Sequence, residues 1–143
     1  MFCDNDFLWK GDPRLIRRYV NEMQPMAVVK HDDYEAEANK MNGIQNKSYP
    51  KKNWSSLMLF RCSQFKNKLN KEYLDNATPA QLHEFHFIHE DNMGSIPKDF
   101  NCLVGHYDCK NAKALHYTNG GPWFDEYKDG ELSEEWWKVY NSL

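Results

Sequence analysis

The chain opens with a short apolar stretch that carries two acidic residues, and this feature constrains its fold more than any other. We expect residues 1–8 to form a buried strand that runs into an acidic tip at Asp4 and Asp6. Side chains two residues apart share one face of a regular strand, so both carboxylates could approach one ligand. In open α/β sheets, ligands bind at the carboxyl edge of the strands. The opening therefore predicts a ligand site at such an edge.

A second apolar stretch supplies a nitrogen ligand. Residues 113–117 are predicted to form a strand ending at His116, and Gly120 and Gly121 follow it. A histidine there is either a hydrogen-bonded core residue or a metal ligand. The two glycines would let backbone N–H groups approach an anion closely, and Trp123 would cover the site. Two carboxylates, one imidazole and open positions suit Mn²⁺ or Mg²⁺. We therefore predict a metal site formed by Asp4, Asp6 and His116.

The rest of the chain reads as mixed helices and strands, which favours the α/β class. Asp12 followed by Pro13 predicts a helix start, because aspartate accepts a hydrogen bond at the N-cap and proline suits the first turn. Asn70 is predicted to cap a second helix, to Asn76, and Ser133 to open a last one. Residues 32–50 are polar and irregular. The further predicted strands are residues 26–29, 55–60, 85–88 and 103–104.

Taken in order, several stretches resemble a known family. These stretches are Asp4–Leu8 with Gly11–Pro13, Val28–Asp32, Tyr49–Phe60, Ile96–Asn101 and His116–Trp123. On them the chain is similar to glycosyltransferase family 8, the glycogenin and galactosyltransferase group, and closer still to a bacterial and phage branch of uncharacterised transferases. The resemblance implies a partial GT-A fold, a mixed sheet flanked by helices. It also implies a Mn²⁺ (or Mg²⁺) enzyme that moves a hexose from a nucleotide-diphosphate sugar to a glycan or other hydroxyl acceptor.

Two departures from the family pattern affect this expectation. The family has a nucleotide-binding half before the acidic motif, whereas this chain begins almost on that motif and resembles only the carboxyl-terminal half. A lysine precedes the Pro-Trp pair in the family, whereas Gly121 stands there in this chain. Phosphate neutralisation would then depend on the metal and on Lys51 or Lys52. The alternative function is a catalytically incomplete subunit that binds a metal-diphosphate and needs a complementing chain or a second copy.

The resemblance also implies roles for residues away from the metal. Asn5 would lie near the ribose, and Asn53 or Ser55 would hydrogen-bond a sugar hydroxyl, with a plain buried strand start as the alternative. Asp91, or Glu90 beside it, would contact the transferred sugar or the acceptor as the catalytic carboxylate.

Three histidines offer a competing metal site for a zinc hydrolase. His83, His86 and His89 are three residues apart, a spacing that would bring the first two together on a helix. Phe85 and Phe87 alternate with His86, however, and this alternation predicts a strand that turns neighbouring imidazoles to opposite faces. We therefore expect no zinc site here.

Composition and cysteine spacing limit the remaining classes. The 143 residues fit one domain, residues 1–143, and a formal net charge of -3 gives no electrostatic footprint for nucleic acid. No apolar run reaches membrane-spanning length, and no charged-then-apolar leader opens the chain. The cysteines form no C-x-x-C pair. We expect free buried thiols and a cytoplasmic location.

Overall fold

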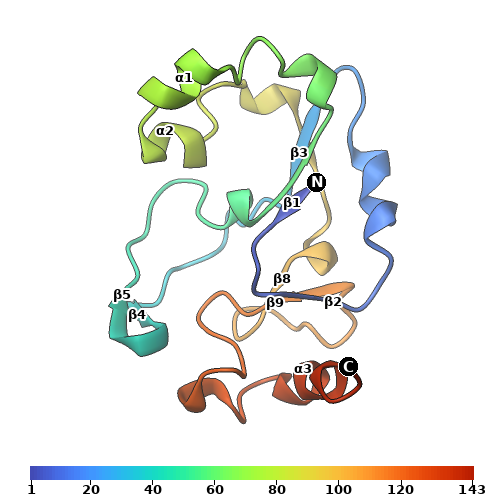
Figure 1. The fold of residues 1–143 in the computed structure, drawn as a ribbon, viewed down its shortest axis with the longest axis vertical. Coiled ribbons are helices and arrows are strands. Elements are labelled where there is room, and N and C mark those ends of the chain that lie inside the picture. Colours follow the sequence, from blue (N-terminus) through green and yellow to red (C-terminus); the bar gives the residue numbers. More distant parts are fainter.

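The computed structural model describes all 143 residues except the side chain of Asn42, and Figure 1 shows their arrangement. It is a mixed α/β structure of small sheets and short helices. The strands are β1 (Phe2–Cys3), β2 (Phe7–Trp9), β3 (Met26–Val28), β4 (Asn39–Lys40), β5 (Ile44–Gln45), β6 (Leu57–Phe60), β7 (Met93–Ser95), β8 (Cys102–Leu103) and β9 (Ala114–His116). The α-helices are α1 (Lys71–Asn76), α2 (Pro79–His83) and α3 (Ser133–Tyr140). The 3-10 helices are η1 (Pro13–Tyr19), η2 (Met41–Gly43), η3 (Trp54–Ser56), η4 (Cys62–Gln64), η5 (Glu90–Asn92), η6 (Lys98–Phe100) and η7 (Asp125–Tyr127).

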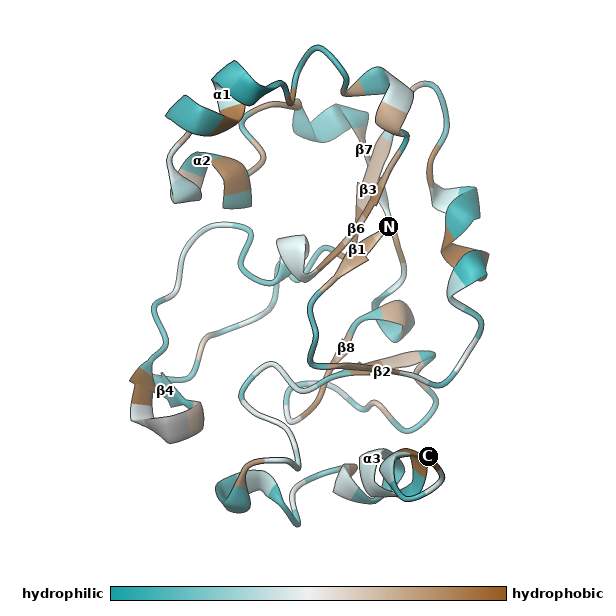
Figure 2. Cartoon of the chain, viewed as in Figure 1, coloured by the Kyte–Doolittle hydropathy of each residue, from teal (hydrophilic) through white to brown (hydrophobic). Residues whose placement is uncertain are grey.

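The described strands form sheets with the orders β1-β6-β3-β7, β2-β9-β8 and β4-β5. In the first sheet, β3 lies antiparallel to β6 and parallel to β7. Ala27 and Val29 pack on one face of this sheet, and Met26 and Val28 pack on the other. Burial on both faces explains the continuous apolar run that sequence reasoning identified as a strand. The sheet forms a hydrophobic layer through the upper half of the molecule in Figure 2.

The predicted single strand over residues 1–8 is wrong. Cys3 pairs with Leu57 in the first sheet, and the Asp4 N–H still donates to the Ser56 carbonyl at 2.9 Å. The chain then turns, and Phe7 pairs with His116 in the second sheet. The two aspartates therefore lie where the backbone crosses from one sheet to the other, rather than at the tip of one regular strand.

Local signals were more reliable for helices than for strands. The Asp12 carboxylate accepts from the Arg14 N–H at 2.9 Å, and Asn70 accepts from the Tyr73 N–H at 2.8 Å, so both predicted N-caps are confirmed. The predicted strand over 85–88 is wrong. After α2 the chain turns, with Phe85 at a φ of 60° and buried in the core. Tertiary burial of Phe85, rather than strand pairing, explains this apolar stretch.

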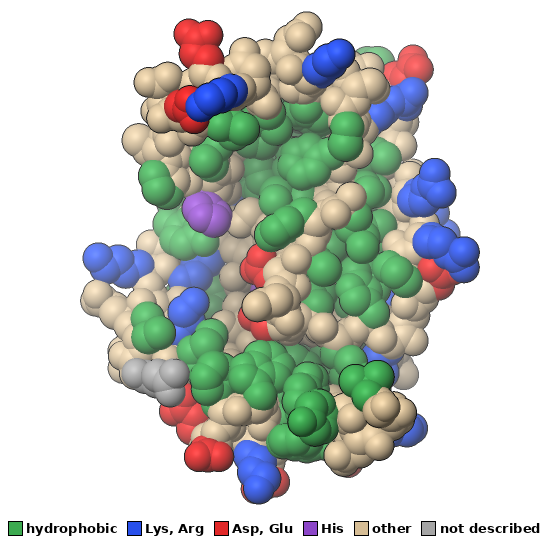
Figure 3. All heavy atoms as spheres, viewed as in Figure 1, with side chains coloured by type: hydrophobic (Ala, Val, Ile, Leu, Met, Phe, Trp, Pro, Cys, Tyr) green, Lys and Arg blue, Asp and Glu red, His purple; other side chains and the backbone are tan. Residues whose placement is uncertain are grey.

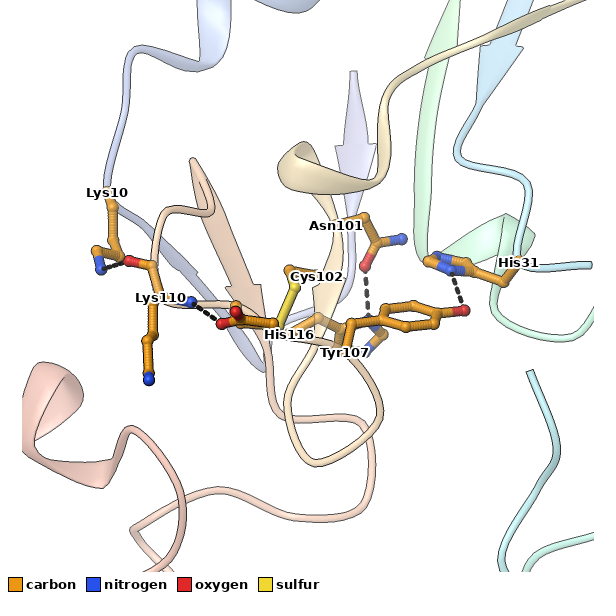
Figure 4. Close-up of a disulfide and its surroundings, with 9 residues drawn as sticks. Lys10, His31, Asn101, Cys102, Tyr107, Lys110 and His116 are labelled. Carbon is orange, nitrogen blue, oxygen red and sulfur yellow. Dashed lines mark hydrogen bonds between the residues drawn. A yellow bond between two sulfur atoms is a disulfide. The ribbon is translucent and has the colours of Figure 1, made fainter. Parts of the chain in front are cut away.

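The prediction of free buried thiols is also wrong. Cys102 and Cys109 form a disulfide with a Cα–Cα distance of 5.6 Å, whereas Cys3 and Cys62 are free and Cys62 is exposed. The disulfide closes the loop between β8 and β9 directly after Asn101, as Figure 4 shows. No C-x-x-C spacing marks this pair. The loop between the two strands brings the two cysteines together.

Removing the disulfide should lower stability. For the Cys102→Ala/Cys109→Ala double variant we expect the free energy of unfolding to fall by about 2–3 kcal/mol, since closing a loop this short removes that much chain entropy from the unfolded state. Urea unfolding of the oxidised proteins measures the effect. Cys62→Ala, which removes an exposed free thiol, is the control and should leave the midpoint unchanged. Equal midpoints for the wild type and the double variant would contradict the pairing.

A buried histidine links the segment after β3 to the β8–β9 loop. The His31 ring stacks on Tyr107 with centroids 5.8 Å apart, and its Nδ1 lies 3.4 Å from the Tyr107 hydroxyl. That hydroxyl donates to Asp33 at 2.9 Å, so the Nδ1–H of His31 donates to it in turn. Burial, with the nearby charges of His116 and Lys98, lowers the pKa of His31 from 6.5 to about 3. His31 is therefore neutral in the folded protein at pH 7.

This lowered pKa predicts a loss of stability in acid. Below pH 6.5 the unfolded chain binds a proton at His31 and the folded chain does not, so stability falls as the pH drops from 6.5 toward 3. The slope should be at most about 1.4 kcal/mol per pH unit for this one group. Urea unfolding between pH 7 and pH 4 should give a shallower dependence for His31→Gln than for the wild type. His89→Gln, at an exposed histidine, should keep the wild-type slope; equal slopes for all three proteins would refute the assignment.

Candidate metal centre

The three predicted metal ligands meet in the structure. Asp4, Asp6 and His116 each offer one ligand atom, and these atoms all lie within 4.8 Å of one another. His116 Nε2 lies 3.3 Å from Asp6 Oδ1. The pairing of β2 with β9 sets this arrangement, because Phe7 is opposite His116 and the Tyr117 N–H donates to the Asp6 carbonyl at 3.1 Å. The Phe7 ring also stacks on the imidazole, with centroids 4.5 Å apart.

A buried chain of hydrogen bonds fixes the orientation of His116. The Ser56 hydroxyl donates to the Asn53 carbonyl at 2.5 Å, so the Ser56 oxygen accepts from the Asn101 side-chain NH₂ at 2.8 Å. The Asn101 Oδ1 then faces His116 Nδ1 at 2.8 Å, and this nitrogen must carry a proton to donate (Figure 4). In metal sites, a hydrogen bond of this type from the nitrogen that does not bind the metal orients the histidine ring. We call this chain the Ser56–Asn101–His116 network.

The network leaves His116 Nε2 facing a carboxylate oxygen that lacks a hydrogen bond. Asp6 Oδ1 is buried and has no hydrogen-bond partner within the described residues. With its proton fixed on Nδ1, the imidazole either holds a second proton at Nε2 or offers a lone pair there. A cation between Nε2 and Oδ1 would satisfy both atoms. The residues present therefore fit a metal ion.

The charges of the centre favour a cation as well. Burial raises the pKa of Asp4 above its ordinary value, and the negative charge of Asp6 raises it further, against the lowering effect of His116. Burial alone would also raise the pKa of Asp6, but the neighbouring His116 imidazole, 3.3 Å away, outweighs it and lowers that pKa. A bound metal would supply positive charge between these groups and would relieve the crowding of the two carboxylates.

The centre lines a cavity of about 680 Å³. Its polar part, beside the three ligands, contains Asn53, Ser55, Thr118, Lys40, Lys52 and His83. Its apolar part is made by Phe2, Met58, Phe60, Leu69, Leu74, Leu82 and Phe87. Figure 3 shows a hollowed hydrophobic surface that continues toward acidic side chains, with basic side chains across the hollow from them.

Two of the predicted ligand-binding residues lie in this cavity. Asn53 has a φ of 65°, and its side-chain NH₂ is buried without a hydrogen-bond partner among the described residues. Ser55 Oγ lies 3.0 Å from His83 Nδ1. Asn53 directly precedes η3 and Ser55 lies within it, rather than on a strand, and both side chains line the cavity. Asn5 is exposed and does not line it.

The structure does not bring Asp91 to the centre. Asp91 lies on η5, its side chain is 89% exposed, and its carboxylate is 3.3 Å from His89 Nδ1. It is not among the residues that line the cavity. Glu90 forms ion pairs with Lys51 at 3.2 Å and with Lys30 at 3.4 Å. The spacing to the Ile96–Asn101 segment suggested a catalytic carboxylate here, but the turn before β7 directs it to solvent.

The glycine pair has a packing role instead of lining the cavity. Gly120 has a φ of 142°, and its N–H already donates to the Tyr117 carbonyl at 2.9 Å. A Cβ on Gly121 would lie 2.1 Å from the Trp123 ring, so this ring needs a glycine there. Trp123 packs against Tyr117 and α3, and it does not cover the metal centre.

The three histidines of the competing zinc site have separate neighbours. His83 contacts Ser55, His86 contacts Glu84 at 3.2 Å, and His89 contacts Asp91. In the part of the chain that the structure describes, Asp4, Asp6 and His116 are the group of three acidic or histidine residues with a metal-binding arrangement. The absence of zinc near His83 stays a prediction.

Comparison with known proteins corrects the family assignment. Protein CDI of Arabidopsis thaliana is 39% identical in a match that covers 95% of this chain and 55% of that protein. The chain thus spans about half the length of the curated relative it matches. No protein family matches the chain, and no solved structure matches it. The predicted membership of glycosyltransferase family 8 is therefore wrong; short acidic and glycine-containing stretches recur too easily by chance to carry it.

Loss of any metal ligand should weaken Mn²⁺ binding. In a calorimetric titration we expect Asp4→Asn, Asp6→Asn and His116→Gln each to raise the Mn²⁺ dissociation constant at least about tenfold, since even outer partners of metal ligands contribute that much. Asp12→Asn is the control, because it changes an exposed carboxylate whose capping role asparagine keeps. Undiminished binding in Asp4→Asn and Asp6→Asn, both half-buried positions where folding should persist, would refute the site.

Proposed function

We propose that this chain transfers a hexose from a nucleotide-diphosphate sugar to a glycan or another hydroxyl acceptor, with Mn²⁺ or Mg²⁺ held by Asp4, Asp6 and His116. One observation supports this most. Three suitable ligand atoms converge at the side of an open cavity that also contains amide, hydroxyl and lysine groups. Its volume of about 680 Å³ lies in the usual range for pockets that bind small molecules.

The chain's own residues would divide the task. Asp4, Asp6 and His116 Nε2 would hold the metal, which when bound supplies positive charge for a departing diphosphate. Asn101 would keep the imidazole turned toward it. The unpartnered NH₂ of Asn53 would donate to an oxygen of the donor, and the Ser55 hydroxyl would bond a sugar hydroxyl. The stacked Phe7 ring would keep water from one side of His116.

The second candidate is a subunit that binds a metal-diphosphate and needs a complementing chain or a second copy to act. It is favoured by the apolar part of the cavity and by β1, which lies at the edge of its sheet. Phe2 is 47% exposed there. Edge strands present unpaired N–H and C=O groups that pair readily with another chain. An added strand would extend the sheet and cover this apolar surface.

A cytoplasmic location remains part of the proposal, but the cysteines no longer support it. The Cys102–Cys109 pair removes the argument from free thiols, because disulfides are rare in reducing compartments. Separately, no helix among the described residues is long and apolar enough to cross a membrane.

The activity is testable with donors alone. In the presence of Mn²⁺ we expect the chain to release nucleoside diphosphate from at least one member of a panel of nucleotide-diphosphate sugars, with or without a sugar acceptor. Removal of the metal by a chelator, or the Asp6→Asn change, should reduce the rate at least about tenfold, because charge stabilisation of the leaving group is lost. Asp12→Asn is again the control.

The outcomes separate the two candidates. Release that depends on Mn²⁺ and on Asp6 supports the transferase. Mn²⁺-dependent binding of nucleoside diphosphate without turnover, restored by a complementing chain, supports the second candidate. Absence of both binding and turnover in the folded protein would refute both.

A further inference from the structure

A short hairpin carries a lysine that lines the same cavity as the aspartates. β4 pairs with β5 through Lys40 and Ile44, and the Asn46 N–H closes the hairpin on the Ala38 carbonyl at 2.9 Å. Lys40 is half-buried and lines the same cavity as the metal ligands. We call residues 38–46 the hairpin arm; it projects at the left of Figure 1, where β4 and β5 are labelled.

The arm is attached to the loop that follows His116. The Met41 N–H donates to the Asn119 carbonyl at 2.8 Å. Gly120 lies so close to the arm that a Cβ on it would be 3.2 Å from the Met41 Cβ. Because Met41 follows Lys40 directly and Asn119 is close in sequence to His116, these contacts hold the lysine beside the metal centre.

Among the described residues, the ammonium of Lys40 makes no ion pair or hydrogen bond. Lys51, by contrast, pairs with Glu90, and Lys52 donates to Asn46 and to the Lys47 carbonyl. Lys40 lines the same cavity as both aspartates, so a charged group near the centre is available for a ligand.

We propose that Lys40 binds a phosphoryl oxygen of the diphosphate held at the metal centre. The inference rests on the proposed function and specifies which residue supplies the second positive charge. Sequence reasoning assigned that charge to Lys51 or Lys52, but both already have oxygen partners. The positive charge of Lys40 would weaken the binding of the metal ion alone. It would strengthen the binding of the diphosphate.

Two titrations test the proposal, with inorganic pyrophosphate as the probe. Removing Lys40 should weaken pyrophosphate binding at saturating Mn²⁺ about tenfold or more, because a hydrogen bond between charged groups is lost. The same Lys40→Gln change should leave Mn²⁺ binding alone unweakened or slightly tighter, because a positive charge near two carboxylates is removed. A residue that only supports the fold would weaken both.

Matched variants complete the experiment. Lys40→Arg should keep pyrophosphate binding within a few-fold of wild type, since arginine retains the charge. Lys66→Gln, at an exposed lysine outside the cavity, should change neither titration. Unchanged pyrophosphate binding in Lys40→Gln, or equal weakening of both titrations, would overturn the role of Lys40 and leave the proposed function standing. If the wild type binds Mn²⁺ but not pyrophosphate, the proposed function fails and the Lys40 proposal fails with it.

Discussion

The hydrogen bond between Asn101 and His116 is the contact on which the candidate site depends. Both side chains are almost completely buried, at 0% and 2% exposure, so neither can exchange its partner for water. Loss of one partner would leave a buried polar group unpaired, at a cost of about 1–3 kcal/mol. The bond also decides which imidazole nitrogen faces Asp6. One contact thus serves both the stability of the core and the chemistry of the cavity.

Several elements hold this contact in place. β8 runs parallel to β9 with Leu103 opposite His116, so Asn101, just before β8, lies beside the imidazole. The Cys102–Cys109 disulfide closes the loop that connects these strands, and the Ser56 hydroxyl, directly before β6 of the other sheet, accepts from the Asn101 amide. The site therefore joins the two larger sheets. Asp4 and Asp6 lie where the chain crosses between those sheets.

Sequence reasoning found the residues of the centre but not the way the fold assembles them. Local sequence signals identified the candidate ligands Asp4, Asp6 and His116, and the structure brings these three together. Local signals also predicted the N-caps at Asp12 and Asn70, and the structure confirms both. The break in the first strand depends on β1 and β2 joining different sheets. The disulfide and the position of Lys40 depend on strand pairing and on contacts across the chain, which no spacing reveals. Long-range contacts of this kind are absent from local patterns.

The arrangement of charge around the cavity couples its two expected ligands. Two carboxylates would favour a cation, and Lys40, which lines the same cavity, would disfavour that cation and attract an anion. Binding of a diphosphate would neutralise the lysine and add oxygen ligands for the metal, so each ligand would raise the affinity for the other. Linkage requires this effect to be equal in both directions. On the proposed function, such a centre would bind the metal and the diphosphate best as a pair, and that is the form in which a nucleotide-diphosphate sugar would present them.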